Sequence, residues 1–119
     1  MTVKQRKNLL NMELKRIVTQ IIKRYRPEKI ILFGSLAEDK IHQWSDLDLL
    51  IIKKTNKRII GRRMQVYRIA KPKVGLDLFI YTPQEIKMFL RENSSFIAEI
   101  LEQGEILYEK RSTGMAAGS

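Results

Sequence analysis

Three short apolar segments constrain the fold of this chain most strongly. They cover residues 30–33, 47–52 and 74–81. The second segment is apolar on both sides of a strand except at Asp48, and the third is apolar on both sides except at Asp77. Strands of this kind lie inside a sheet that is covered on both faces. The chain is therefore predicted to contain central strands with helical segments between them, which is an α/β architecture.

The segments between and around these strands carry helical patterns. Apolar residues recur at three- and four-residue steps over residues 4–25, and Pro27 ends that helix. A short helical turn over 36–40 is expected to be capped by Ser35. Residues 55–69 predict a basic helix. Its buried stripe is expected to consist of three residues, Ile60, Met64 and Tyr67.

The C-terminal part predicts two more helices and an edge strand. Thr82, Pro83 and Glu85 form the signature of a capping box at a helix start. A second helix is expected to end at Gly104, and residues 105–109 are expected to form the edge strand. We expect a single domain over residues 1–110. Residues 111–119 are expected to be a disordered tail of the kind that an expression vector appends.

Composition narrows the cellular setting. The 119-residue chain contains no cysteine, which excludes disulfides and Cys-ligated metals. No apolar run approaches the roughly 20 residues of a membrane span, and the N-terminal residues lack the apolar core of a secretory signal. These features predict a cytoplasmic protein with no membrane partner.

The charge balance predicts an anionic partner. Lys and Arg number 23 against 13 acidic residues, and residues 53–73 contain nine bases and no acid. A field of this sign attracts nucleotides, nucleic acids or acidic proteins. We expect the cluster at 53–73 to flank a triphosphate or an anionic partner instead of forming a duplex-binding surface. Nucleic-acid binding is expected to be weak, non-specific and strongly salt-dependent.

Three aspartates stand where apolar residues would be expected. Asp46 and Asp48 project on the same side at the start of one strand, and Asp77 interrupts the next. If these strands pair, three carboxylates converge on one point. Hard cations such as Mg²⁺ bind through carboxylates and complete their shell with water and phosphate oxygens.

The pair Gly34-Ser35 follows the first strand and suggests the phosphate end of the same site. Glycine allows the backbone to approach a ligand closely, and serine offers a hydroxyl and an N–H group. Each feature alone is common in turns and on surfaces. Gly-Ser, then ten residues, then Asp-x-Asp, then an aspartate in the following strand is a much tighter combination.

This combination resembles the DNA polymerase β nucleotidyltransferase superfamily. Within it, the small size resembles the minimal nucleotidyltransferases, which are antitoxins encoded beside HEPN-domain toxins. The resemblance covers roughly residues 8–110. It implies a mixed β-sheet flanked by helices in a single domain, with Asp46, Asp48 and Asp77 as catalytic residues and ligands of two Mg²⁺ ions. Gly34 and Ser35 would bind the nucleoside triphosphate.

The implied activity is transfer of AMP from ATP to a hydroxyl of a partner protein, a HEPN toxin. Many minimal members read G-S-R-A-R-G, whereas the residues after Gly34-Ser35 here are Leu-Ala-Glu-Asp. Lys40 or a base within 53–63 is the candidate replacement for those arginines. Three alternatives remain open: an enzyme acting on a small molecule or RNA, a non-catalytic partner-binding subunit, and a nucleic-acid-binding module.

Overall fold

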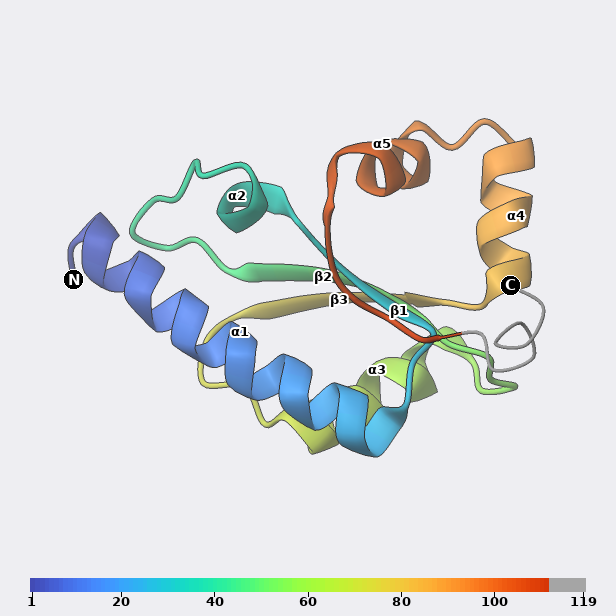
Figure 1. The fold of residues 1–119 in the computed structure, drawn as a ribbon, viewed down its shortest axis with the longest axis horizontal. Coiled ribbons are helices and arrows are strands. Elements are labelled where there is room, and N and C mark those ends of the chain that lie inside the picture. The colour runs from blue at the N-terminus through green and yellow to red at the C-terminus, as the bar shows by residue number, and fades with distance from the viewer. Residues whose placement is uncertain (112–119) are drawn as a thin grey trace.

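A four-stranded sheet forms the centre of the fold and carries helices on both faces (Figure 1). The computed structural model describes residues 1–111, so the predicted tail lies outside the described residues apart from Arg111. The strand order is β3-β2-β1-β4. Strands β2 and β3 run parallel, whereas β1 runs antiparallel to both β2 and β4. The predicted mixed sheet flanked by helices is therefore confirmed.

Helices and strands alternate along the chain much as the sequence predicts. The elements are α1 (Val3–Tyr25), β1 (Lys29–Phe33), α2 (Gly34–Ala37), β2 (Leu47–Ile52), α3 (Ile59–Ala70), β3 (Leu76–Tyr81), α4 (Pro83–Arg91), α5 (Ser95–Gln103) and β4 (Glu105–Glu109).

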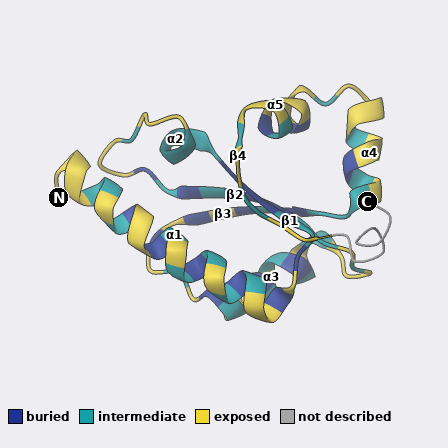
Figure 2. Ribbon diagram, viewed as in Figure 1, coloured by how far each residue is buried: buried dark blue, intermediate teal, exposed yellow. Residues whose placement is uncertain are grey.

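The larger core lies between the sheet and the helix pair α1 and α3. Leu10, Ile17 and Ile21 of α1 are fully buried against Leu49 and Ile51 of β2. Figure 2 shows buried residues on the side of α1 that faces the sheet, and exposed residues on its outer side. These two helices thus cover the side of the sheet that carries Leu49 and Ile51.

Helices α4 and α5 cover part of the opposite face. Ile86, Ile97 and Ile100 pack against Ile31 and Leu50 in a second, smaller core. The capping box predicted at the start of α4 is present, because Thr82 Oγ1 accepts from the Glu85 N–H and the Glu85 carboxylate accepts from the Thr82 N–H. The smaller core leaves the N-terminal ends of β2 and β3 outside the cover of α4 and α5.

The buried stripe predicted for α3 is wrong. Ile60, Met64 and Tyr67 are 64%, 47% and 37% exposed. The buried side of α3 instead contains Arg62, Val66 and Ala70. Arg62 is accommodated there because its guanidinium pairs with the Glu85 carboxylate at 2.7 Å and donates to the backbone carbonyls of Lys57 and Ile80.

Side chains of α3 cover the outer edge of β3. Tyr67 Oη donates to the carbonyl of Leu76, Arg63 Nε donates to that of Leu78 at 3.0 Å, and Arg62 Nη1 donates to that of Ile80 at 3.0 Å. These carbonyls belong to alternate residues, so they point away from β2 along the edge of the sheet. The outward-facing carbonyls of β3 are thus satisfied from within the molecule.

Within the described part of the chain, no helix combines the length and apolar character needed to cross a membrane.

Candidate active site

Asp48 and Asp77 occupy facing positions on the two parallel strands of the sheet. Each is the second residue of its strand, and the register pairs Asp48 directly with Asp77. Because side chains alternate along a strand, both carboxylates lie on the face that carries α4 and α5, as do Leu50 and Phe79. The condition set by the sequence analysis, that these two strands pair, is met, and the pairing places the two carboxylates side by side.

Asp46 lies just before β2 and is held by an arginine from the start of α1. Arg6 Nη2 is 3.3 Å from Asp46 Oδ1, and Arg6 Nε donates to the carbonyl of Ser45 at 2.9 Å. The Arg6 side chain is only 17% exposed in this position. The third carboxylate therefore has a cationic partner of its own, which the sequence did not indicate.

The environment of Asp48 disfavours its charged form. Burial in the sheet, a hydrogen bond with the Asp77 carboxyl group, and the charges of Asp77 and Asp46 together raise the pKa of Asp48 from 3.8 to about 6. Two carboxylates this close share a proton readily, or they require a cation between them. The pair is an electrostatically unfavourable arrangement that a bound cation relieves.

Two glycines make the room in which these carboxylates lie. A Cβ atom on Gly34 would overlap the Asp48 carboxylate, and one on Gly75 would overlap the Asp46 carboxylate. Gly34 also has a φ of +79°, a left-handed backbone conformation that disfavours other residues. Glycine is therefore needed at position 34 for two reasons: it leaves space for the Asp48 carboxylate, and it adopts the backbone conformation of the turn after β1.

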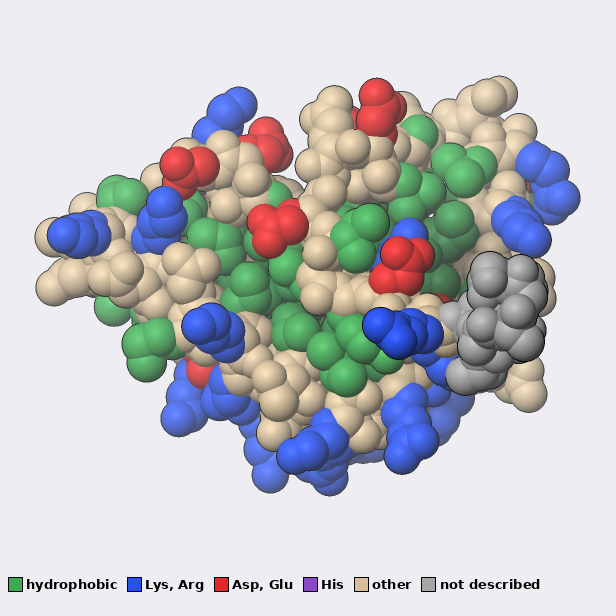
Figure 3. Space-filling view, in the orientation of Figure 1, with side chains coloured by type: hydrophobic (Ala, Val, Ile, Leu, Met, Phe, Trp, Pro, Cys, Tyr) green, Lys and Arg blue, Asp and Glu red, His purple; other side chains and the backbone are tan. Residues whose placement is uncertain are grey.

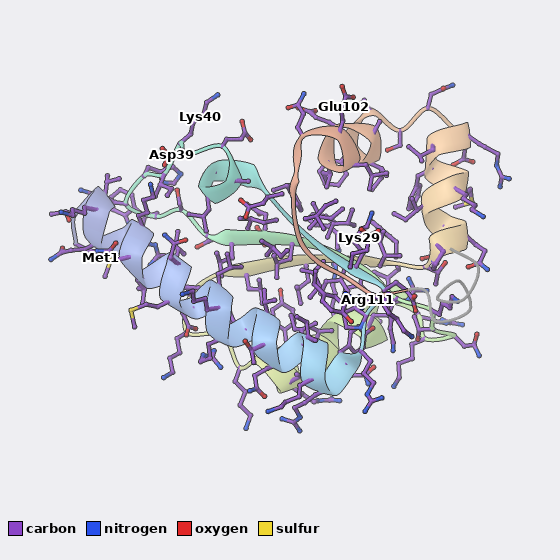
Figure 4. The ribbon with its side chains drawn as sticks, in the orientation of Figure 1. Met1, Lys29, Asp39, Lys40, Glu102 and Arg111 are labelled. Atoms are coloured by element: carbon purple, nitrogen blue, oxygen red, sulfur yellow. The ribbon has the colours of Figure 1, made fainter. Side chains whose placement is uncertain are left out.

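Ser35 lies within the first turn of α2 and does not cap that helix. The helix begins at Gly34, its N-cap is Phe33, and no side chain caps it. The predicted capping role of Ser35 is wrong because the chain enters the helical conformation one residue earlier. Lys40, a candidate for the missing arginines, is 78% exposed, lies 3.7 Å from the Glu38 carboxylate and points away from the sheet (Figure 4).

Three phenylalanines line the face of the sheet beside the carboxylates. The ring centroids of Phe33, Phe79 and Phe96 lie 5.2–5.8 Å apart. Phe33 is the β1 partner of Asp48, and Phe79 follows Asp77 by two residues on the same face. The site thus has an apolar wall next to its acidic residues.

A cavity of about 180 Å³ opens beyond this wall, between α2 and α5. Phe33, Ala37, Phe96 and Ile100 supply its apolar lining, and Glu38, Glu99, Gln103 and Gly104 complete it.

The carboxylates provide the ligand type that Mg²⁺ prefers, although they do not form a ready-made cage. Within residues 1–111, no three acidic or histidine side chains already surround one point. The reason is visible at Asp46, whose carboxylate is engaged by Arg6 while Asp48 and Asp77 face each other. An all-oxygen set with excess negative charge fits a hard divalent cation.

Most of the basic cluster at 53–73 lies away from the carboxylates. Helix α3 and its flanking loops cover the sheet face opposite Asp48 and Asp77. Lys53 is engaged by the carbonyls of Tyr25 and Arg26, and Arg62 by Glu85. Arg63 is the exception, because its guanidinium reaches past the edge of β3 to lie 5.7 Å from the centroid of the Phe79 ring.

Comparisons with known proteins agree with this geometry. The family described as "Polymerase beta, Nucleotidyltransferase" matches residues 15–113. A crystal structure from Sulfolobus solfataricus, of a protein assigned as a nucleotidyltransferase, superposes with a TM-score of 0.64 at 16% identity and covers 92% of this chain and 89% of that chain.

A mutant form of the toxin–antitoxin complex MntA–HpeT contains a second similar chain. Its TM-score is 0.56 at 21% identity, with 82% of this chain and 73% of that chain covered. No curated protein sequence matches this chain. At these identities the two structures show a shared fold, and the family match extends over most of the sequence. The chain therefore belongs to the polymerase β nucleotidyltransferase family.

Proposed function

We propose that this protein is a Mg²⁺-dependent nucleotidyltransferase that transfers AMP from ATP to a hydroxyl group of a partner protein. The partner proposed is a HEPN-domain toxin, so that the protein acts as its antitoxin. The observation that carries the proposal is the register of Asp48 with Asp77 on parallel strands, in a chain of this family. Because ATP is the proposed substrate, we place the reaction in the cytoplasm.

The three aspartates are the proposed ligands of two Mg²⁺ ions. When bound, Mg²⁺ neutralises charge on phosphate oxygens and on the attacking oxygen. The raised pKa of Asp48 and its proximity to Asp77 support this assignment, since the site has excess negative charge. Arg6 would have to release Asp46 for the third carboxylate to take part.

The remaining roles follow from position. The N–H groups at Gly34 and Ser35 and the Ser35 hydroxyl are the proposed donors to the triphosphate. In the reaction, the acceptor oxygen forms a bond to the α-phosphorus and the bond between that phosphorus and pyrophosphate breaks. Asp77, which is exposed, is the proposed acceptor of the hydroxyl proton.

A protein acceptor is favoured over the alternatives by one comparison. The MntA–HpeT neighbour is a toxin–antitoxin complex, and this chain shares its fold with one component over 82% of its length. Positioning of the acceptor supplies much of the rate of such reactions. The partner is proposed to bring its own hydroxyl-bearing segment to the open ends of β2 and β3.

Intact-mass analysis of the adjacent gene's product tests this proposal. After incubation with this protein, ATP and Mg²⁺, the partner should gain the mass of one or more AMP groups. Asp77→Asn should abolish the gain, and Asp39→Asn, the same change outside the site, should preserve it. An unmodified partner beside a modified small alcohol or RNA end would refute a protein acceptor. Failure of Mg²⁺–ATP to raise the melting temperature would refute the site itself.

A further inference from the structure

The net positive charge of the protein is confined to one part of the chain. Residues 1–75 contain 19 of the 23 bases and six of the 13 acids, whereas residues 76–119 contain four bases and seven acids. The first part includes α1 and α3, and the second includes α4, α5 and β4. Figure 3 shows Lys and Arg side chains gathered along the lower border of the molecule, where α1 and α3 lie.

Six exposed basic residues on and beside α1 and α3, named at the end of this paragraph, form what we call the α1/α3 basic surface. In the part of the chain that the structure describes, none of these side chains forms an ion pair. The members are Lys15, Lys23, Arg24, Arg26, Lys54 and Lys71.

Hydrogen bonds from side chains to backbone carbonyls bring together the separate segments that carry these basic residues. Arg16 Nη2 donates to the carbonyl of Lys71 at 3.0 Å, which fixes the end of α3 beside the middle of α1. Lys53 Nζ donates to the carbonyl of Tyr25 at 2.7 Å, which fixes the loop after β2 beside the end of α1. The backbone segments that carry these bases are thus fixed beside one another.

On the α1 side of this surface the side chains among the bases are polar, whereas α3 also exposes Ile60 and Met64. The exposed positions along this side of α1 are Asn8, Asn11, Met12, Lys15, Thr19 and Lys23, in which Met12 is the one large apolar residue. A helix that lies on a membrane surface inserts Trp, Phe or Leu, and a protein interface is centred on apolar or aromatic residues. Contacts with phosphates need only cations and hydrogen-bond donors.

We propose that the α1/α3 basic surface binds the phosphate backbone of double-helical nucleic acid. From Lys15 to Arg26 the helix spans about 17 Å, the length over which a duplex presents about ten phosphate charges. The exposed positions of α1 include no aromatic residue, and Tyr67 of α3 is tied to the β3 edge by its hydroxyl, so the surface fits a duplex better than stacked single-stranded bases. It lies on the opposite side of the sheet from Asp48 and Asp77, which leaves the carboxylates accessible. This differs from the expectation that bases in 53–73 flank the triphosphate.

Fluorescence anisotropy with labelled DNA and RNA duplexes of about 20 base pairs tests the proposal. The test variant is Lys23→Gln/Arg24→Gln/Lys71→Gln. The matched control is Lys40→Gln/Lys87→Gln/Arg91→Gln, which removes the same charge from the loop after α2 and from α4. All six side chains are exposed, and thermal melts verify that both variants fold.

The wild type should bind duplexes of unrelated sequence equally, with affinity that falls steeply between about 50 and 200 mM salt. The test variant should bind at least about tenfold more weakly, and its log–log salt slope should be smaller by about 2–3, near 0.9 for each lost contact. The control should keep the wild-type slope. Binding of either duplex supports the proposal, and the tighter of DNA and RNA identifies the nucleic acid.

Three results would overturn the proposal. One is the absence of binding at about 50 mM salt. Another is equal weakening in the test and control variants, which would indicate net charge alone. The third is stronger binding to polyglutamate or to phosphatidylserine-containing vesicles than to the duplexes at equal charge concentration, which would indicate an acidic protein or a membrane as the partner.

Discussion

Replacing Asp48 by Asn should stabilise the metal-free protein, and the gain should depend on pH. The folded-state pKa of Asp48 is about 6 and its reference value is 3.8, so the folded protein binds the proton more tightly than the unfolded chain. Ionisation of Asp48 therefore destabilises the fold. Stability is lost as the pH rises from about 4 to about 6 and is not regained above that. This difference in pKa corresponds to at most about 3 kcal/mol.

Partial exposure of the carboxylate reduces that limit to an expected 1–2 kcal/mol, or about 5–10 °C in melting temperature. Thermal melts in EDTA across pH 4–8 measure the difference between the wild type and Asp48→Asn. Asp39→Asn is the matched control, because its carboxylate is 76% exposed and should change stability little. A difference between Asp48→Asn and the wild type that stays constant across this pH range would refute the electrostatic argument.

Gly34→Ala should cost about 1–3 kcal/mol and abolish stabilisation by Mg²⁺, because the new methyl group meets a strained φ and the carboxylate beneath it. Gly61→Ala, where the backbone is helical and a Cβ would make only an ordinary contact with Lys57, should instead stabilise by about 0.5–1 kcal/mol, and urea melts measure both changes. Arg62→Met should destabilise by about 3 kcal/mol, since it leaves the partly exposed Glu85 carboxylate without its cation and two backbone carbonyls without their donor; a loss below about 1 kcal/mol would contradict this. Arg6→Gln should increase the rise in melting temperature caused by Mg²⁺ alone, because Asp46 loses its competing cation, and an unchanged response would refute that competition.

Local signals in the sequence predicted local structure well. The bounds of β2 are those predicted, because apolar residues run without a break on both sides of Asp48. The capping box of Thr82 and Glu85 also formed as predicted, since its two halves lie three residues apart. The sequence suggested that Asp48 and Asp77 meet if their strands pair, whereas the parallel direction and the direct register come from the structure.

Features that depend on distant partners were not predictable in the same way. Two stripes of α3 recur at helical spacing, and the choice of the buried one depends on Glu85, which belongs to another helix and pairs with Arg62. Arg6 reaches Asp46 across 40 positions of sequence, and no local pattern connects them. The sequence pattern likewise places Gly75 in a strand and gives no sign that a side chain there would overlap the Asp46 carboxylate.

The coverage of the β3 edge by α3 has a consequence for assembly. An exposed strand edge is a template on which another chain can add a strand, and this is a common route to aggregation. Tyr67, Arg63 and Arg62 already donate to its outward carbonyls, and their side chains lie along this edge, so addition of a strand to β3 is hindered. Among the described strands the other edge is β4, which carries Glu105 and Glu109, the latter paired with Lys29. Acidic residues on an edge strand disfavour its pairing with a second copy, so both edges of the sheet carry features that oppose strand addition.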